Sequence, residues 1–193
     1  MTSRKLPNVL VTGTPGTGKS SHCAAIAEAF SSLAHIDVNA LAREQGLFDG
    51  FDEDRKVEVL DDDKVCDALE EVLKNGGKLV DTHSMVDYFP ERWFDLVVVL
   101  RTDNTVLYDR LTKRGYDDRK IQENVQAEIM QVLEEEAKDS YAKEIVQVLK
   151  SDSVADLESN VERIVAWAKA WIENNNDDDE DEENDAQSAV KEA

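Results

Sequence analysis

Residues 13–20, Gly-Thr-Pro-Gly-Thr-Gly-Lys-Ser, constrain the fold of this chain more than any other stretch. They match the pattern G-x-x-x-x-G-K-[ST], in which a glycine-rich loop holds phosphate groups. The glycines let backbone N–H groups point inward, and the helix that follows directs its positive end at the same anion. Lys19 adds a full positive charge, and the Ser20 hydroxyl can bind Mg²⁺. Such a loop requires a strand before it and a helix after it.

Both flanks meet that requirement. Residues 8–12 form a short apolar run typical of a buried strand, and the Ala-rich residues 21–30 favour a helix. Further strands are predicted at 34–38, 78–83, 96–100 and 144–149. Further helices are predicted at 39–46, 61–75, 105–114, 120–137 and 154–171, and residues 47–54 read as an aromatic and acidic loop. Because strands alternate with helices, the sequence predicts the α/β class with a parallel sheet of five strands.

The chain is strongly acidic, with a formal net charge of −21 over 193 residues. Residues 174–193 are low in complexity and centred on an acidic run at 177–183, so we expect this tail to be disordered. The tail either aids solubility or contacts a basic partner. The rest of the chain is acidic as well, which disfavours direct binding to RNA and favours a basic protein as partner.

The two cysteines, Cys23 and Cys66, form no C-x-x-C motif, so the sequence favours free thiols in a reducing compartment. No run approaches 18 apolar residues, and residues 1–7 lack the apolar core of a signal peptide. We therefore expect a soluble intracellular protein without direct membrane contact.

Asp81 and His83 are candidates for the second half of a phosphoryl-transfer site. Asp81 follows a predicted strand, and ligands of open α/β sheets lie beyond the carboxyl ends of the strands. Its carboxylate could hold Mg²⁺ together with Ser20. His83 lies two residues later, on the same side by strand alternation, and could orient or deprotonate an attacking oxygen. The alternatives are a solvated Asp and a loop His bonded to backbone.

Arg110 and Arg114 are candidates for a cationic clamp on the transferred phosphoryl group. Their spacing of four residues places them on one face of the predicted helix 105–114. Gly115 and a charged stretch follow, which suggests a hinged lid. The alternative is that both arginines only stabilise the end of the helix.

Several motifs together resemble the adenylate kinase isoenzyme 6 family over residues 7 to about 174. Besides the phosphate loop, they are Leu-Ala-Arg-Glu at 41–44, Val-Asp-Thr-His at 80–83, Phe-Pro-Glu-Arg-Trp-Phe at 89–94, Leu-Arg-Thr-Asp at 100–103 and Lys-Arg-Gly-Tyr at 113–116. The Asp-x-His pair and the Phe-Pro-Glu-Arg-Trp-Phe run are far more specific than the loop, which many unrelated NTPases share.

The resemblance implies a doubly wound P-loop NTPase fold of the nucleoside monophosphate kinase type. It implies one kinase domain over residues 1–173, with a monophosphate-binding arm near 37–60 and a short lid near 113–123. Residues expected to hold MgATP are Gly16, Thr17, Gly18, Lys19, Ser20, Ser21, Arg110 and Arg114, with Ser20 and Asp81 at the metal. Lys19, Asp81, His83 and Arg114 are the expected catalytic residues, and Arg43 and Asp37 the expected contacts to the acceptor.

The resemblance further implies conversion of ATP and AMP to two ADP, slow ATP hydrolysis, and a role in small ribosomal subunit maturation. Partners would be a small-subunit ribosomal protein and the pre-40S particle, in cytoplasm and nucleus. Thr82 and Ser84-Met85 depart from the family pattern. Two alternatives remain open: an assembly factor switched by its nucleotide state, and a kinase acting on a small metabolite.

Overall fold

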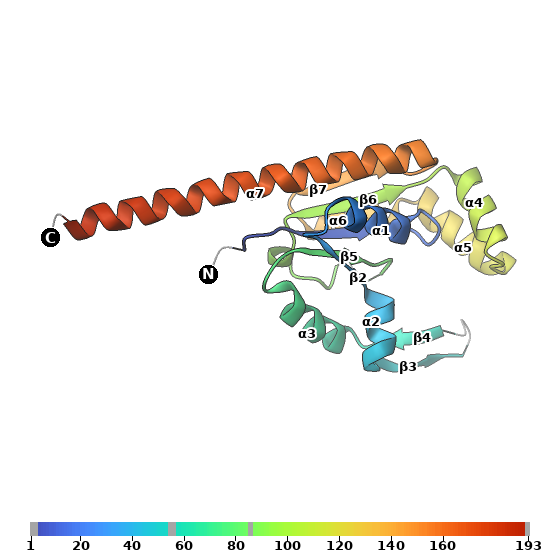
Figure 1. Cartoon of the computed structure of the whole chain (residues 1–193). Coiled ribbons are helices and arrows are strands. Elements are labelled where there is room, and N and C mark those ends of the chain that lie inside the picture. Colours follow the sequence, from blue (N-terminus) through green and yellow to red (C-terminus); the bar gives the residue numbers. More distant parts are fainter. Residues whose placement is uncertain (1–3, 54–56, 85–86, 192–193) are drawn as a thin grey trace.

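The computed structural model describes residues 4–53, 57–84 and 87–191. Its main sheet has five parallel strands in the order β2-β5-β1-β6-β7 (Figure 1). The strands are β1 (Asn8–Thr12), β2 (Ala34–Asp37), β5 (Lys78–Asp81), β6 (Leu96–Arg101) and β7 (Val146–Lys150). The predicted α/β class and the five-stranded parallel sheet are confirmed.

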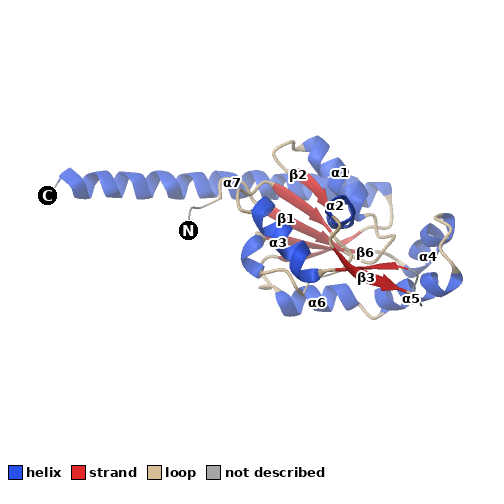
Figure 2. Ribbon diagram, turned by 90° about the horizontal axis from the view of Figure 1, so that it is seen from below, coloured by secondary structure: helices blue, strands red, loops and turns tan. Residues whose placement is uncertain are grey.

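Helices cover both faces of this sheet (Figure 2). They are α1 (Lys19–Ala29), α2 (Val38–Gln45), α3 (Asp62–Leu73), α4 (Asn104–Lys113), α5 (Asp118–Ile129), α6 (Val132–Ser140) and α7 (Val154–Lys191), with a 3-10 turn η1 (Glu91–Trp93). None of the helices in the described ranges combines the length and the apolar character that crossing a membrane requires.

Two apolar cores, one on each face, hold the sheet between its helices. The strands β1 and β6 are central and buried almost throughout, as expected for apolar strands covered on both faces. One core packs β1 and β6 against α1 and α7, with Ile26 and Ile164 among its members. The other packs the sheet against α2, α3 and α6 and includes the aromatic side chains of Phe89, Trp93 and Phe94.

The expected loop at 47–54 is wrong, because part of it is a β-strand. Strands β3 (Phe48–Asp52) and β4 (Val57–Leu60) form a two-stranded antiparallel hairpin between α2 and α3. Strand β3 contains two Asp residues and a Gly, which are uncommon in strands, and Phe51 is 53% exposed. The hairpin therefore lacks the buried alternating face that makes a strand recognisable in a sequence.

The expected single helix at 120–137 is two helices. Helix α5 ends at Ile129, and Gln131 adopts a left-handed conformation with φ of 58° before α6 begins at Val132. Such a break usually involves Gly or Pro, and neither is present. The predicted lid at 113–123 corresponds to the end of α4, a turn at 114–117 and the first part of α5.

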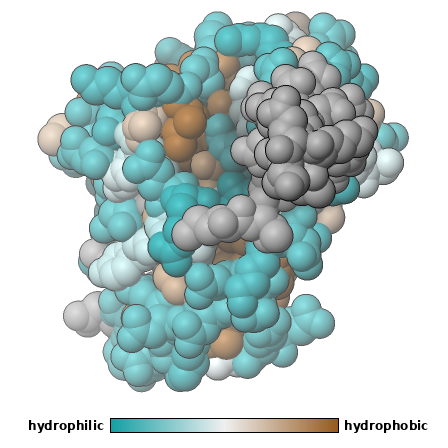
Figure 3. Space-filling model, turned by 90° about the vertical axis from the view of Figure 1, so that its left-hand side faces the viewer, coloured by the Kyte–Doolittle hydropathy of each residue, from teal (hydrophilic) through white to brown (hydrophobic). Residues whose placement is uncertain are grey.

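The helical backbone of α7 continues through the predicted disordered tail to Lys191, which differs from the expectation. Residues 154–191 contain neither Gly nor Pro, and extending an existing helix requires no new nucleation. Figure 1 shows this end of α7 projecting beyond the rest of the molecule. Figure 3 views the molecule from that end; hydrophilic residues dominate the visible face, and fewer hydrophobic ones lie among them.

Candidate active site

The phosphate loop between β1 and α1 has a backbone that only glycine adopts readily. Gly13, Gly16 and Gly18 have φ angles of 147°, 100° and 96°. A Cβ atom on Gly13 would lie 2.6 Å from the carbonyl oxygen of Leu100, which is backbone and cannot rotate away. Ser151, before α7, donates a hydrogen bond of 2.6 Å to the Thr17 carbonyl and braces the loop from outside. The sequence thus builds a rigid, inward-facing turn.

Lys19 opens helix α1, two residues earlier than expected, and its ammonium group lies inside the loop. The Nζ atom donates hydrogen bonds to the carbonyl oxygens of Gly13, at 2.7 Å, and Thr14, at 3.3 Å. The residue is only 8% exposed. Burial lowers the pKa of Lys19 to about 8, although the nearby charge of Asp81 opposes this shift. The loop therefore holds a poorly hydrated positive charge that an anion would stabilise.

Asp81 ends strand β5 and pairs with the serine of the loop. The Ser20 hydroxyl donates a hydrogen bond of 2.6 Å to Asp81 Oδ2. Burial disfavours ionisation of Asp81, but polar contacts from His35 and Ser20 and the charge of Lys19 outweigh it and lower the pKa of this carboxyl. Asp81 is therefore an anion at neutral pH, held beside the phosphate loop at the carboxyl end of the sheet.

A pocket of about 190 Å³ joins the loop to the end of β5, the predicted arm and the predicted lid. Its lining comes from four segments that are distant in sequence. They contribute Pro15, Gly16, Gly18, Lys19, Ser20 and Ser21 from the loop and α1, Asp37 and Asn39 from the start of the arm, Asp81 and His83 from the end of β5, and Arg114 and Tyr116 from the lid. Nine of these twelve are residues that the sequence analysis assigned to the site.

Three predicted site residues do not line this pocket. The side chain of Thr17 is buried within the loop and donates to the Thr14 carbonyl at 2.9 Å. Arg110 binds backbone carbonyls behind the loop: those of Gly16 at 3.3 Å, Ser151 at 2.9 Å and Asp152 at 2.9 Å. The structure thus gives Arg110 a supporting position under the loop.

Arg43, the third of these residues, lies near the end of α2 and is exposed. Its charge still reaches the pocket, since it contributes to lowering the pKa of His83.

His83 lines the pocket, but strand alternation does not explain its position. Strand β5 ends at Asp81, so His83 lies in the turn beyond it, where it retains solvent access. Its Nδ1 atom lies 3.3 Å from the side-chain amide of Asn39. Partial desolvation, followed by the charge of Lys19, lowers the pKa of His83, so the imidazole is neutral at pH 7.

Comparison with known proteins identifies relatives along most of the chain. A family model described as an AAA domain matches residues 9–131. The adenylate kinase isoenzyme 6 homolog of Dictyostelium discoideum is 49% identical over 172 residues, which cover 89% of this chain and 97% of that protein. The chain belongs to the adenylate kinase isoenzyme 6 family. Another member, the homolog FAP7 of Saccharomyces cerevisiae, is 48% identical over an aligned region that covers 88% of this chain and 85% of that protein.

Solved structures agree with the fold of this adenylate kinase isoenzyme 6 family member. A shikimate kinase from Bacteroides thetaiotaomicron superposes with a TM-score of 0.55 at 18% identity, covering 85% of this chain and 99% of that one. A gluconokinase from Sinorhizobium meliloti gives a TM-score of 0.53 at 19% identity, with 85% and 96% covered. These structures show the fold alone; the family relationship, together with the phosphate loop, makes the chain a kinase-like P-loop NTPase.

P-loop kinases generally use ATP with Mg²⁺, and the residues of this family member fit that ion. Mg²⁺ prefers hard oxygen ligands, and the Ser20 hydroxyl and the Asp81 carboxylate oxygens already lie within hydrogen-bond distance of each other. Asp37, a second carboxylate, lines the same pocket.

Glu128, on α5, is a buried charge in this family member that sequence reasoning missed. It is 2% exposed and its carboxylate accepts hydrogen bonds from the Thr14 hydroxyl at 2.5 Å, Arg101 Nε at 2.7 Å and the Thr102 amide at 2.9 Å. Arg101 also pairs with Glu134 on α6. This network ties the phosphate loop to the helices that follow the lid. Nothing local distinguishes Glu128 from the two other acidic residues of α5, Asp118 and Glu123.

Proposed function

We propose that this protein transfers the γ-phosphoryl group of ATP to AMP, giving two ADP, and also hydrolyses ATP slowly. The observation that carries the proposal is the convergence of Lys19, the Ser20–Asp81 pair and Arg114 on one pocket that the arm also lines. Phosphoryl transfer needs positioning and charge neutralisation more than covalent chemistry. This pocket offers both, with cations on two sides of the space where the phosphates would lie.

In this proposal Lys19 and Arg114 neutralise the charge that spreads over the transferred group. Lys19 approaches from the loop and Arg114 from the lid. Ser20 and Asp81 would hold Mg²⁺, which neutralises phosphate charge when it is bound. Arg110 supports the carbonyl side of the loop, so its contribution to ATP binding is through loop geometry.

The acceptor would lie between the arm and the pocket. Asp37 caps helix α2 through the Ala40 amide at 3.0 Å and lines the pocket, and Arg43 lies on the same helix. A guanidinium group suits a phosphate monoester, because it can donate two parallel hydrogen bonds. Swinging of the exposed Arg43 side chain toward the pocket would place it on the monophosphate of AMP.

His83 separates the two reactions chemically. A phosphate oxygen of AMP attacks as an anion and needs no base, whereas water must lose a proton as its oxygen bonds to phosphorus and the ADP oxygen leaves. A neutral imidazole can take that proton. His83 is neutral and solvent-accessible in the pocket, which supports a role in hydrolysis.

At the cellular level, we propose that the protein acts in small ribosomal subunit maturation, including late pre-rRNA cleavage, in cytoplasm and nucleus. Its relationship to the family supports this, and the net charge of −21 suits a basic ribosomal protein of the pre-40S particle better than bare RNA. The alternative is an assembly factor in which hydrolysis, rather than AMP phosphorylation, is the physiological activity. His83 favours that alternative.

Product analysis tests the proposal. The full chain is incubated with MgATP, with and without AMP, and ADP and free phosphate are measured separately. We expect AMP to produce two ADP for each AMP consumed, and ATP alone to release phosphate slowly. Lys19→Ala should abolish both. Absence of both activities, or equal turnover by Lys19→Ala, would refute the assignment.

Added partners separate the remaining alternatives. A basic small-subunit ribosomal protein that accelerates phosphate release without AMP would favour the assembly factor. Phosphorylation of a small metabolite in an acceptor screen, with AMP inert, would favour the metabolite kinase.

A further inference from the structure

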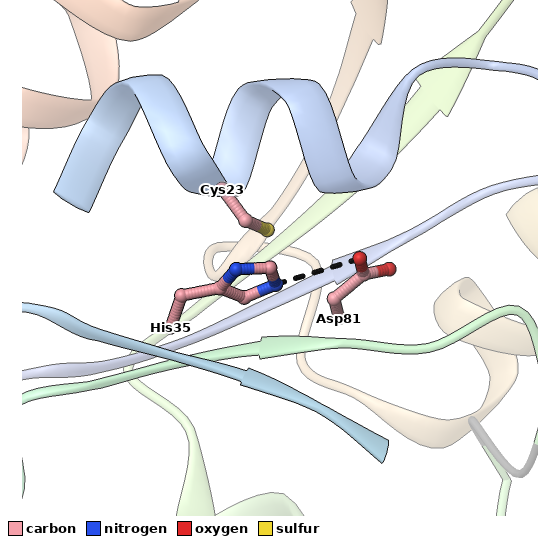
Figure 4. A group of neighbouring side chains, drawn as sticks. All are labelled: Cys23, His35 and Asp81. Atoms are coloured by element: carbon pink, nitrogen blue, oxygen red, sulfur yellow. Dashed lines mark ion pairs between the residues drawn. The ribbon is translucent and has the colours of Figure 1, made fainter. Parts of the chain in front are cut away.

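Three metal-ligating side chains meet behind the Ser20–Asp81 pair, between α1 and the sheet (Figure 4). They are Cys23 on α1, His35 on β2 and Asp81 on β5, and their ligand atoms all lie within 4.8 Å of one another. Figure 4 shows the thiol pointing from α1 toward the imidazole and the carboxylate, which come from neighbouring strands. Each element contributes a different type of donor atom: sulfur, nitrogen and oxygen.

The register of the sheet explains this meeting. In the parallel pair β2–β5, His35 lies beside Leu79 and Asp37 beside Asp81. Residues beside each other in a parallel pair point to the same face, so His35 shares its face with Leu79. Leu79 and Asp81 are two residues apart on β5 and also share a face. His35 and Asp81 therefore project on the same side. That side is the one covered by α1, because Leu79 and Cys23 belong to the same core. Cys23 lies one helical turn beyond Ser20, whose hydroxyl bonds to Asp81, and therefore lies on the side of α1 that faces this strand end.

Among the described residues, the Nε2 atom of His35 has only a long polar contact, with Asp81. It is buried and makes no hydrogen bond within the described part of the chain, and its nearest charged neighbour, Asp81 Oδ2, lies 3.5 Å away. That distance is at the outer limit for a hydrogen bond. A buried ring nitrogen without a close partner is costly, and Figure 4 shows this one directed at the Asp81 carboxylate, with the Cys23 thiol on one side.

We propose that Cys23, His35 and Asp81 form a binding site for a borderline-soft divalent cation of the Zn²⁺ type, which lies behind the Mg²⁺ position in the nucleotide pocket and shares Asp81 with it. Thiolate, imidazole and carboxylate are the three ligand types that Zn²⁺ accepts, and three protein ligands with one water complete a tetrahedron. Mg²⁺ does not favour sulfur or nitrogen ligands. Bonds of about 2.0–2.3 Å require the donors to approach one another by roughly 1 Å.

The surroundings allow such an ion to enter and bind. His35 lies on β2, an edge strand of the sheet, and its side chain is 25% exposed, which gives a route from solvent. Cys23 is fully buried, and burial raises the pKa of its thiol, so the group is protonated without a metal. Binding therefore forms a metal–sulfur bond and releases the thiol proton to solvent.

Occupation of this site would interfere with ATP turnover, a consequence that rests on the proposed function. Asp81 Oδ2 faces His35 and is also the atom that accepts the Ser20 hydrogen bond. An ion between Cys23, His35 and Asp81 draws that carboxylate away from Ser20. Zinc would thus act as an inhibitor that removes an active-site carboxylate from its partner.

Direct binding is tested with Co²⁺, a spectroscopic substitute for Zn²⁺, on the full chain without a histidine tag. We expect a near-ultraviolet thiolate-to-cobalt absorption band at one equivalent, abolished by adding Zn²⁺. Cys23→Ala and His35→Phe should weaken binding by roughly 100-fold or more. Cys66→Ala is the matched control and should bind like the wild type, because Cys66 lies on α3 outside the cluster. Absence of the band, or its persistence in Cys23→Ala, would overturn the proposal.

Inhibition is tested separately, at free Zn²⁺ concentrations set by a metal buffer and with MgATP in excess. We expect Zn²⁺ to slow wild type and Cys66→Ala but not Cys23→Ala, whose turnover without zinc should match the wild type. Circular dichroism confirms that each variant is folded. Equal inhibition of wild type and Cys23→Ala contradicts the proposed inhibition. A wild type without ATP turnover refutes the proposed function, while the cobalt experiment still decides the metal site.

Discussion

The hydroxyl of Thr14, in the phosphate loop, donates a hydrogen bond of 2.5 Å to the carboxylate of Glu128, 114 residues later in the chain. Glu128→Gln keeps the shape but removes the charge that faces Arg101. We expect it to lower the free energy of unfolding by about 2–4 kcal/mol and to weaken ATP binding. The amide has one acceptor oxygen instead of two, so either Thr14 or the Arg101–Thr102 side loses its acceptor, and the half-buried Arg101 loses the charge opposite it. Urea denaturation and nucleotide titration measure the two effects.

Glu123→Gln is the control for this prediction. Glu123 lies on the same helix, and its pair with Arg119 is exposed, so its loss should change stability by less than about 1 kcal/mol. Equal effects of the two substitutions would mean that the Glu128 network does not support the loop.

Lys19→Met should stabilise the protein without nucleotide at pH 7 while it abolishes turnover. Burial lowers the pKa of Lys19 from 10.5 to about 8, so between these values the unfolded chain binds more protons than the folded one. Stability of the wild type therefore rises with pH across this window, and below it the buried charge costs of order 1–3 kcal/mol. Met carries no such charge, and the advantage of the variant should shrink as pH approaches 10.5.

Denaturation of both proteins by urea from pH 7 to 10 checks the Lys19 prediction. A variant that is less stable at pH 7, or whose difference from the wild type does not vary with pH, contradicts it.

Gly13→Ala tests the geometry of the phosphate loop. An added Cβ meets the Leu100 carbonyl oxygen at 2.6 Å, and φ is 147°, so we expect a loss of about 2–4 kcal/mol in stability together with loss of ATP binding. Gly46→Ala is the control. Gly46 also has a positive φ, of 70°, but a Cβ added there would have no atom within 4 Å. The substitution should cost only about 1 kcal/mol and leave binding intact. Thermal unfolding with and without ATP distinguishes the two.

Arg114→Ala should lower the kcat/KM for ATP by about 10²- to 10³-fold, because it removes a cation from the lid side of the pocket. Arg119→Ala, also in the predicted lid but exposed and paired with Glu123, should change it little. Steady-state kinetics over a range of ATP concentrations measures both. Similar values for the two variants would exclude a specific role for Arg114.

The sheet and the loop could be predicted because their signals are local. An apolar run before a glycine-rich motif predicts β1, the loop and α1, and Asp81 follows from the rule that ligands bind at the carboxyl ends of parallel strands. Where the local signal is weak, the predictions from the sequence are incomplete or wrong. The hairpin of β3 and β4 buries little, and the break at Gln131 occurs without Gly or Pro.

The contacts that complete the site are set by tertiary structure, which no single segment encodes. Glu128 matters because α5 returns to the phosphate loop, and the sequence shows only one of three acidic residues on a mixed-charge helix. Arg110 and Arg114 are four residues apart, yet one bonds to carbonyls behind the loop and the other faces the pocket. Helical spacing predicts that they are neighbours but not that their partners differ.

Strand β2 ends at Asp37 and helix α2 begins at Val38, so no linker separates the sheet from the arm. A rotation of α2 against the sheet would therefore be taken up at or next to Asp37, the residue that caps the helix and lines the pocket. Under the proposed function, the hinge of the predicted arm would lie inside the active site. Closure over an acceptor would then displace a carboxylate beside the phosphate loop, so acceptor binding would change the electrostatics of the nucleotide pocket.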